Sequence, residues 1–350
     1  MVFLSLGLRA LVNVEALNMV ESVGNIVRHR KAAVVYRRKS SYVVRWVPAV
    51  SGESIAHSYQ SWLATLAVKK GLPTCEYCER HEFVKHADRN IFGSKSWEQD
   101  LARFAEEIER GKTKKSVDIT EFMHIFEKTI VENCVVEDIG GFLYAGRIPV
   151  KRTSRFASGY MIPALDAIER AVIETQFQVR HAPTASQRWE QAQMPYNVEV
   201  ASAIYAWSFY IDLASVGCTS AVKRECLSIE ERRKRAELAI DALALMLDTR
   251  IFGAKQTRFS PMIDYETVLV ALSSPLPFNV SPPASGIIFV EDTVKRAKTF
   301  RKATESEVRL YAYARDGDIV KNLEASGVKV YPTLLEMFSE VKNDAMSMLR

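Results

Sequence analysis

The order in which strand patterns and amphipathic helix patterns follow one another limits this chain to few folds. Ser51 and Ser228 each hold an N-cap position in front of apolar residues that recur at helical spacing. Strand patterns, in which apolar and polar residues alternate, occupy residues 3–16, 135–148, 196–213 and 267–272. The chain therefore reads strand, helix, strand, strand, helix, strand.

This order predicts an α+β fold with a ferredoxin-like, or RRM-like, βαββαβ core that is interrupted by insertions. Capping boxes at Ser96 and Asp118 predict two helices in the first insertion. A short helix is expected to begin at Pro163, a polar loop at 184–194, and a strand at 286–290. The predicted division is 1–73 with 135–275 for the discontinuous core, 74–134 for a helical insertion, 149–196 for a thumb-like irregular insertion, and 276–350 for a C-terminal αβ appendage.

Length and composition exclude few functions. The 350 residues suffice for one large domain or two ordinary ones, and a net charge of +5 permits a polyanionic partner without requiring one. No stretch approaches the roughly 18 apolar residues that a membrane helix needs, so no membrane partner is expected. Five scattered cysteines do not make a disulfide framework, which fits a reducing compartment, and we expect a cytoplasmic protein.

Signatures of common enzyme classes are missing from the sequence. The patterns GxSxG, GxxxxGK[ST], HExxH and GxGxxG do not occur. Acidic pairs such as Glu106 with Glu107 and Glu291 with Asp292 are typical of solvated faces or helix starts. We therefore predict no catalytic residues, no enzymatic activity and no cofactor that function requires.

Basic segments that carry a glycine are the best candidates for contact with a nucleic-acid backbone. Gly24 and Asn25 precede the basic run 28–31, and Gly253 precedes Lys255 and Arg258. Glycine lets the main chain approach a phosphate while basic side chains neutralise its charge. Each segment is equally compatible with a solvated turn, and the sequence leaves both interpretations open.

Three further sites share this ambiguity. The helix start at Ser51 can hold a phosphate at its N–H groups, or it can be an ordinary cap. Arg152 and Arg155 begin the irregular region, and His181 lies near its polar loop. Because no pair of strand aromatics suggests base stacking, binding is expected to involve the backbone and to be insensitive to base sequence.

The stretch TCEYCERHEFVKH concentrates metal-ligand side chains in one loop. Cys75, Cys78, His81 and His86 follow the spacing C-x2-C-x2-H-x4-H, which is close to that of a zinc knuckle. Four such ligands suit tetrahedral zinc. Two alternatives stay open, namely reduced thiols without metal and a Cys75–Cys78 disulfide.

Seven blocks of the sequence together resemble a known family. In order they are NVEALNMVESVGNIVRHR, VPAVSGESIAHSYQ, CVVEDIGGFLY, RTSRFASGYMIPALDA, QFQVRHAP, YNVEVASAIY and FGAKQTRF. They resemble the DevR-type backbone subunit of archaeal type I-A CRISPR effector complexes (Cascade), within the RAMP superfamily. The resemblance covers about residue 8 to about residue 275 and is looser in the 74–134 insertion and the C-terminal tail.

The resemblance implies a scaffold that binds CRISPR RNA. Such subunits stack as a helical filament along the spacer part of the guide, a thumb crosses the guide, and the guide pairs with target DNA. The implied partners are CRISPR RNA, target DNA through the guide, further copies of the chain and other Cascade subunits. The residues expected to contact RNA are Asn18, Ser22, Asn25, Arg28, His29, Arg30, Ser51, Gly52, Ser54, Arg152, Arg155, His181, Lys255 and Arg258.

Two other functions compete with this one. Backbone subunits of type III complexes share the fold and cut target RNA with an acidic residue, for which Asp166 is the formal candidate here. A transcriptional regulator, which the name DevR suggests, would bind duplex DNA sequence-specifically, but the sequence shows no helix-turn-helix pattern.

Overall fold

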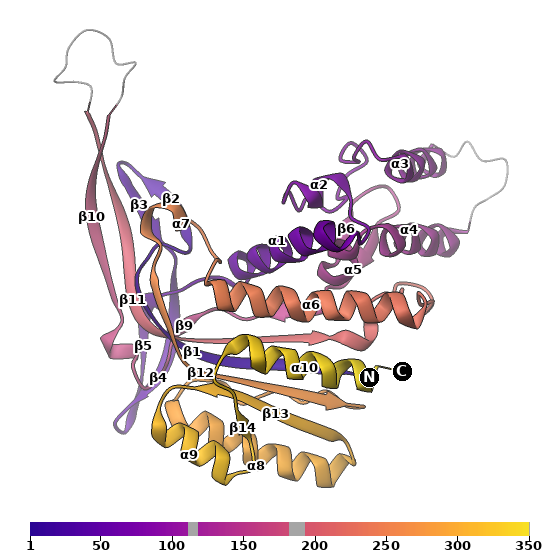
Figure 1. The fold of residues 1–350 in the computed structure, drawn as a ribbon. Coiled ribbons are helices and arrows are strands. Elements are labelled where there is room, and N and C mark those ends of the chain that lie inside the picture. Colours follow the sequence, from indigo (N-terminus) through magenta and orange to yellow (C-terminus); the bar gives the residue numbers. More distant parts are fainter. Residues whose placement is uncertain (111–117, 182–192, 350) are drawn as a thin grey trace.

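A mixed sheet forms the centre of the molecule in the computed structural model, which describes residues 1–110, 118–181 and 193–349 (Figure 1). In the described part of the chain this sheet has ten strands. Its middle consists of β1 (Phe3–Glu15), which pairs antiparallel with β11 (Gln193–Asp212) on one side and with β12 (Met262–Ser274) on the other. The fold is thus α+β, as the sequence predicts.

Shorter strands extend the sheet on both sides. β13 (Glu307–Ala314) and β14 (Lys329–Val330) continue it beyond β12. Beyond β11 lie β3 (Ile26–His29), which runs parallel to it, and β2 (Met19–Val23). Three more strands pair antiparallel with β11, namely β8 (Phe156–Ser158), β9 (Ile162–Pro163) and β10 (Val172–His181).

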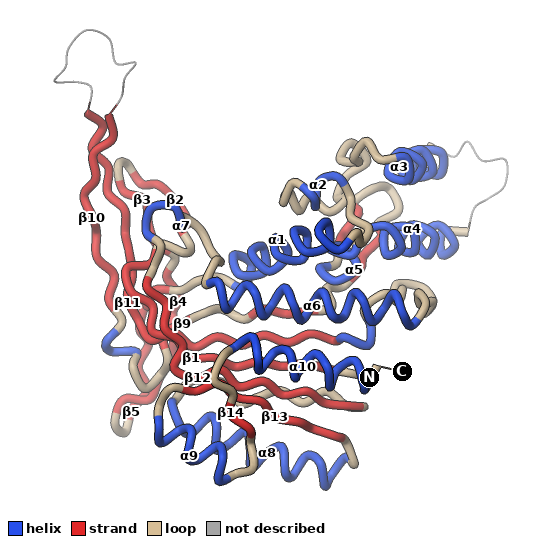
Figure 2. The backbone as a smooth tube through the Cα atoms, in the orientation of Figure 1, coloured by secondary structure: helices blue, strands red, loops and turns tan. Residues whose placement is uncertain are grey.

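Helices cover both faces of this sheet (Figures 1 and 2). On one face, α1 (Gly52–Lys70), α6 (Ile229–Thr249) and α10 (Leu334–Met348) share a buried apolar cluster with alternate β1 residues from Leu4 to Val12. The other β1 side chains face the opposite side, where the Ser5 hydroxyl donates to the Phe278 carbonyl at 2.9 Å. There α8 (Gly286–Thr304) and α9 (Gly317–Ala325) pack against alternate residues of β12.

A group of helices lies beyond the C-terminal end of α1. It contains α2 (Glu76–Glu79), α3 (Ser96–Glu109), α4 (Ile119–Asn133) and α5 (Val135–Gly140), with the small hairpin of β6 (Phe142–Tyr144) and β7 (Val150–Arg152). The N-cap of α1 is at the opposite end, toward β2, β3 and the short helix α7 (Gln256–Phe259) (Figure 1). The long β10–β11 hairpin projects from that end of the molecule.

The remaining elements are short. β4 (Lys31–Arg38) and β5 (Ser41–Pro48) form a separate hairpin. Two 3-10 turns, η1 (Ile168–Arg170) and η3 (Leu213–Ser215), precede β10 and follow β11. No helix among the described residues has the length and apolar character to cross a membrane.

Several local predictions are confirmed at the helix caps. The side chains of Ser51, Asp118 and Ser228 each accept a hydrogen bond from a backbone N–H in the first turn of the following helix. Ser96 is different, because Lys95 holds the N-cap position of α3 and provides no side-chain cap. The predicted domain division stays a prediction. The 184–194 loop falls mostly outside the described residues.

Three predicted elements are wrong in type. Residues 135–140 form α5 and not a strand, because their side chains at 135, 136, 138 and 139 are all buried around one helical turn. The apolar run 286–290 is the first turn of α8, whose buried face continues through Val294 and Ala297. Pro163 ends β9, and the only helical turn nearby is η1, within the described residues.

Candidate nucleic-acid interface

Hydrogen bonds bring two predicted segments together at the start of α1. The Asn18 side-chain oxygen accepts from the Ser51 N–H at 2.8 Å and from Arg30 Nε at 2.8 Å. The Ser54 hydroxyl donates to the Leu17 carbonyl at 3.2 Å. Asn18, Arg30, Ser51 and Ser54 therefore form one structural unit, in which Asn18 connects the β2–β3 segment to the helix.

A third predicted segment joins the same unit through Gly253. Its N–H donates to the Ser58 hydroxyl at 2.9 Å, and the next N–H, of Ala254, donates to the Leu17 carbonyl at 2.8 Å. Gly253 has φ +79°, and a Cβ there would lie 2.8 Å from that of Leu17, so only glycine fits. This turn sets Lys255 and Arg258 beside the β2–β3 hairpin.

The result is a surface hollow of about 410 Å³ lined by side chains from both segments. Four of the predicted residues line it, together with three apolar or aromatic neighbours and a glycine: Ser22, Asn25, Lys255 and Arg258 with Gly24, Val27, Pro195 and Tyr196. Arg258 Nη1 donates to the Tyr196 hydroxyl at 3.2 Å. The hollow thus combines two cations, small polar groups and one aromatic ring.

Tyr196 is the aromatic residue of this hollow, and it is not among the residues predicted to contact RNA. It lies near the start of β11, where the hairpin leaves the sheet, and its hydroxyl donates to Gln178 Oε1 at 2.7 Å. An aromatic ring beside cations is what single-strand binding uses, because any base can stack on it. In the sequence, Tyr196 could have been noticed as an aromatic residue that follows the polar loop 184–194.

Arg28 also lies on this side of the molecule. It is exposed on β3, and its Nη1 lies 3.7 Å from Glu21 Oε1 of β2. An exposed pair at that distance is weak, so a phosphate can compete for the guanidinium. Arg28 thus adds a third cation to the β2–β3 surface.

Ser51 and Gly52 do not lie at the surface, where the expected contact with a phosphate would need them. Both are buried, and a Cβ on Gly52 would lie 2.2 Å from the Ser158 carbonyl oxygen. The main chain of β8 therefore covers the first turn of α1, which explains why glycine stands at position 52. These two residues hold the interface segments in place, and the surface itself comes from β2, β3 and the 253–259 turn.

His29 faces the interior, because successive residues of a strand point to opposite sides. Its Nε2 lies 2.7 Å from Glu15 Oε1, and both side chains are fully buried. The expected RNA contact of His29 is therefore wrong. Burial lowers the pKa of His29, but the hydrogen bond and charge of Glu15 outweigh burial, so the pKa is raised above the ordinary value of 6.5.

This pair makes stability depend on pH. Because the folded chain holds the His29 proton more tightly than the unfolded chain, the stabilisation is complete below about pH 6.5 and is lost as pH rises through the folded pKa. We expect the free energy of unfolding to fall above pH 6.5 and to fall less steeply in His29→Gln. Urea unfolding of both proteins across this range measures the slopes, and equal slopes would contradict the assignment.

Arg152 also lies away from the surface, inside the helical group. Its Nη1 lies 2.7 Å from Glu127 Oε1, and its Nη2 pairs with Asp138, and all three side chains are fully buried. Arg235 Nη1 binds the other oxygen of Asp138 at 2.9 Å. Arg152 is thus part of a network in which Arg152 and Arg235 pair with Glu127, Asp138 and Glu231, and the RNA contact predicted for Arg152 is wrong.

Arg155 and His181 complete the set of predicted residues. Half-buried Arg155 lies beside this network, where its Nη2 donates to the Cys218 carbonyl and to the Ser220 hydroxyl, each at 3.0 Å. His181 is the last residue of β10, where its backbone pairs with Gln193 of β11. Its side chain lies outside what the structure describes, so its contact with RNA stays a prediction.

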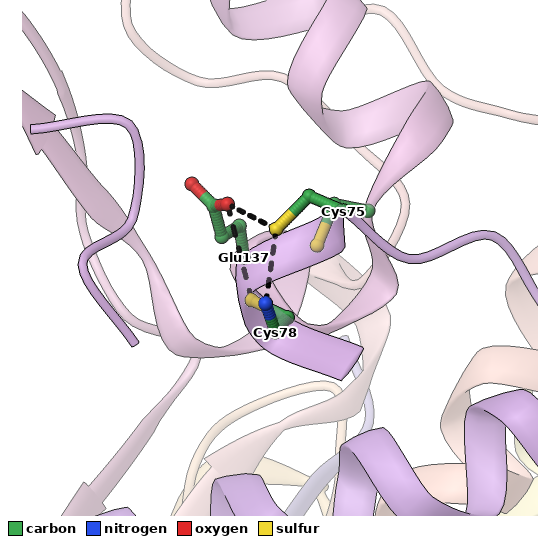
Figure 3. Close-up of side chains that lie close together, drawn as sticks. Cys75, Cys78 and Glu137 are labelled. Carbon is green, nitrogen blue, oxygen red and sulfur yellow. Dashed lines mark hydrogen bonds between the residues drawn. The ribbon is translucent and has the colours of Figure 1, made fainter. Parts of the chain in front are cut away.

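The Cys/His loop brings together only three of its four predicted ligands. Cys75 and Cys78 are buried free thiols, which excludes a disulfide between them, and His86 is buried beside them. His81 is exposed and points elsewhere, with Nε2 3.3 Å from the Thr65 hydroxyl. Cys134 and Glu137 complete the cluster in its place, as Figure 3 shows for Cys75, Cys78 and Glu137.

The remaining two cysteines form a disulfide, between Cys218 and Cys226. The sequence indicates only that five scattered cysteines make no disulfide framework, and it does not single out this pair. The two residues face each other across a tight loop as an isolated antiparallel bridge, an arrangement that their spacing in the sequence does not reveal.

Comparison with known proteins shows matches over most of the chain. A family model described as "CRISPR-associated negative auto-regulator DevR/Csa2" matches residues 6–297. The "CRISPR-associated protein Cas7/Csa2 1" of Saccharolobus solfataricus is 38% identical over 82% of this chain and 83% of its own length. The "CRISPR-associated aCascade subunit Cas7/Csa2 2" of the same organism is 37% identical over 82% and 84%.

A solved structure shares the fold at low sequence identity. One chain of a "CRISPR RNA-guided surveillance complex, pre-nicking" superposes with a TM-score of 0.54 at 10% identity, over 98% of this chain and 99% of that one. The sequence matches define a CRISPR-associated protein. Within that class, the chain belongs to the DevR/Csa2 family.

Proposed function

We propose that this protein is a backbone subunit of a type I-A Cascade-like complex, which binds CRISPR RNA and acts in the cytoplasm. The observation that carries the proposal is the hollow in which Lys255, Arg258 and Tyr196 meet Ser22 and Asn25 of the β2–β3 hairpin. A relative at 37% identity is named as a subunit of such a complex, which supports the same assignment.

The chemistry of the hollow suits the backbone of a single strand. Two cations neutralise phosphates, small polar groups hydrogen-bond to phosphate or sugar oxygens, and an aromatic ring stacks against a base of any identity. None of these contacts reads a base edge. Sequence would therefore be read by pairing between the guide and target DNA, as in other guided systems.

Copies of the chain would stack as a helical filament along the guide, with other Cascade subunits at its ends. The projecting β10–β11 hairpin, which overlaps the predicted 149–196 thumb, supports this arrangement (Figure 1). The arrangement of strands and helices supports a ferredoxin-like core. Across the sheet, β12 is followed by β1, by β11 and then by β8 with β9. Along the chain, α1 follows β1, and α6 lies between β11 and β12.

We assign no catalytic role to the chain. Both oxygens of Asp166, the candidate for RNA cleavage, have partners: Oδ1 lies 3.0 Å from Arg9 Nη1, and Oδ2 accepts from the Gly286 N–H at 2.9 Å. A carboxylate held in this way supports the position of α8 and is poorly placed to bind a metal ion. The geometry thus favours a scaffold over a type III-like nuclease.

Two assays separate the three functions. We expect single-stranded RNA of varied sequence to bind alike, with a log–log salt slope of roughly −0.7 per phosphate contact in each subunit. Preference for one duplex DNA sequence would favour a regulator. We also expect complementary RNA, added with Mg²⁺ to the protein bound to its guide, to stay intact, whereas cuts at regular intervals would favour a nuclease.

A further inference from the structure

Two short helices present the Cys75 cluster in matching positions. Cys75 is the N-cap of α2 and Cys78 its third residue, and Cys134 is the N-cap of α5 and Glu137 its third residue. An N-cap side chain and the third residue lie on the same side of the first turn. The spacings C-x2-C and C-x2-E therefore direct four ligand side chains toward one point between the helices.

The distances at that point suit a tetrahedral ion. The three sulfurs and one Glu137 oxygen all lie within 4.8 Å of one another. Glu137 Oε1 lies 3.2 Å from Cys75 Sγ and 4.0 Å from Cys78 Sγ (Figure 3). A tetrahedron with Zn–S of about 2.3 Å and Zn–O of about 2.0 Å has edges of about 3.5–3.8 Å. Shifts of about 1 Å or less would therefore complete it.

The cluster also contains a polar atom that the protein leaves without a partner. Glu137 is completely buried, and no group among the described residues forms a hydrogen bond with its Oε2. Leaving a buried polar atom unsatisfied destabilises the folded chain. The other oxygen, Oε1, faces the sulfurs, and a cation bound there would reduce the cost of burying the charged carboxylate, which three weakly donating thiols cannot do.

The surroundings of the cluster supply positive charge and orientation. His86 Nδ1 lies 2.7 Å from Glu137 Oε1, and its Nε2 lies 3.2 Å from Glu98 Oε1, so His86 bridges two buried carboxylates. The Lys85 ammonium donates to the Gly140 carbonyl at 2.9 Å, at the end of α5. Three thiolates and a carboxylate around a divalent ion leave excess negative charge, which these neighbours offset.

We propose that Cys75, Cys78, Cys134 and Glu137 bind one structural zinc ion, with His86 orienting Glu137. Thiolate ligands select zinc over the harder divalent ions, and four protein ligands leave no open position for chemistry. The ion would join α2 to α5 across the 74–140 segment and so hold the helical group to the end of α1. This site does not depend on the proposed function.

The test is metal content and cobalt spectroscopy of the full chain, purified without chelator. We expect about one zinc per chain, and a cobalt-substituted form with thiolate charge-transfer bands and the intense visible bands of tetrahedral cobalt. Cys134→Ser should lower zinc content at least tenfold, although the sequence pattern omits Cys134. His81→Ala, which alters the ligand suggested by sequence alone, is the matched control and should retain the metal.

Two further variants define the fourth ligand. Glu137→Gln should lose zinc during dialysis, whereas His86→Gln should keep one zinc with an affinity lower by about 10–100-fold. If Cys134→Ser does not fold, the cobalt spectrum of the unaltered chain and the shift of its Tm on chelation decide whether the site exists.

Two results would overturn the proposal. One is a folded chain that takes up neither zinc nor cobalt, and the other is metal that is lost in His81→Ala but kept in Cys134→Ser. Bound RNA measured on the same samples tests the proposed function separately.

Discussion

Replacing Arg152 by methionine is expected to lower the free energy of unfolding by about 3–5 kcal/mol. The change removes the cation between Glu127 and Asp138, both fully buried, while keeping most of the apolar volume of the side chain. Asp138 keeps Arg235 as a partner, but Glu127 keeps only hydrogen bonds from the 220–221 main chain and the Ser220 hydroxyl. Among the described residues, a buried carboxylate without a directly paired cation therefore remains.

Lys151→Met is the matched control for this experiment. Lys151 is the exposed neighbour of Arg152 on the same strand, and its replacement removes the same charge. We expect its effect on urea unfolding to stay within about 0.5 kcal/mol. If Arg152→Met were as stable as this control and instead lost RNA, Arg152 would be a surface contact after all and the described network would be wrong.

Removing both cations of the hollow is expected to weaken RNA binding strongly. Affinity for a single strand scales with salt concentration to the power of about −0.7 per phosphate contact, so losing two contacts lowers it about 25-fold at about 0.1 M salt. The double variant Lys255→Ala with Arg258→Ala should therefore bind single-stranded RNA about 25-fold less tightly. Its log–log salt slope should be shallower by about 1.4.

The control removes two charges from the other side of the sheet. Lys298 and Lys302 are exposed on α8, which covers the face opposite to α1 and α6 (Figure 1). Lys298→Ala with Lys302→Ala makes the same change in net charge and should leave both affinity and slope close to those of the unaltered chain. Equal losses in the two double variants would mean that total charge, and not the hollow, determines binding.

Local signals in the sequence predicted much of the fold because they depend on neighbouring residues. The caps at Ser51 and Ser228 are satisfied within one turn of the residue that forms them. The same local approach was misleading for 135–140 and 286–290. There, runs of β-branched and aromatic residues resemble strands until the burial of a whole helical turn is known.

The site residues were harder to predict, since a basic side chain does not indicate which way it points. Arg28 and His29 are adjacent on β3, yet one is exposed and the other forms a buried pair with Glu15. Arg152 is buried because Glu127 and Asp138, distant in sequence, neutralise it. Only tertiary contacts separate such residues from those that line the hollow.

The metal cluster shows the same limitation. His81 stands at a plausible ligand spacing, but it has φ +62° in a loop that turns it outward. Cys134 and Glu137, which replace it, lie more than fifty residues farther along the chain. A motif restricted to one loop could not include them, because α4 and α5 bring them to Cys75 only in the folded state.

The most direct test of the central claim is the identity of the RNA that this protein carries in its native cells. Purification from those cells followed by sequencing of the bound RNA should yield CRISPR RNA, with spacer sequences flanked by repeat-derived ends. The bound RNA should be single-stranded and protected over the spacer. Bound RNA without CRISPR repeat and spacer sequences, or no bound RNA at all, would contradict the claim that this chain is a guide-binding backbone subunit.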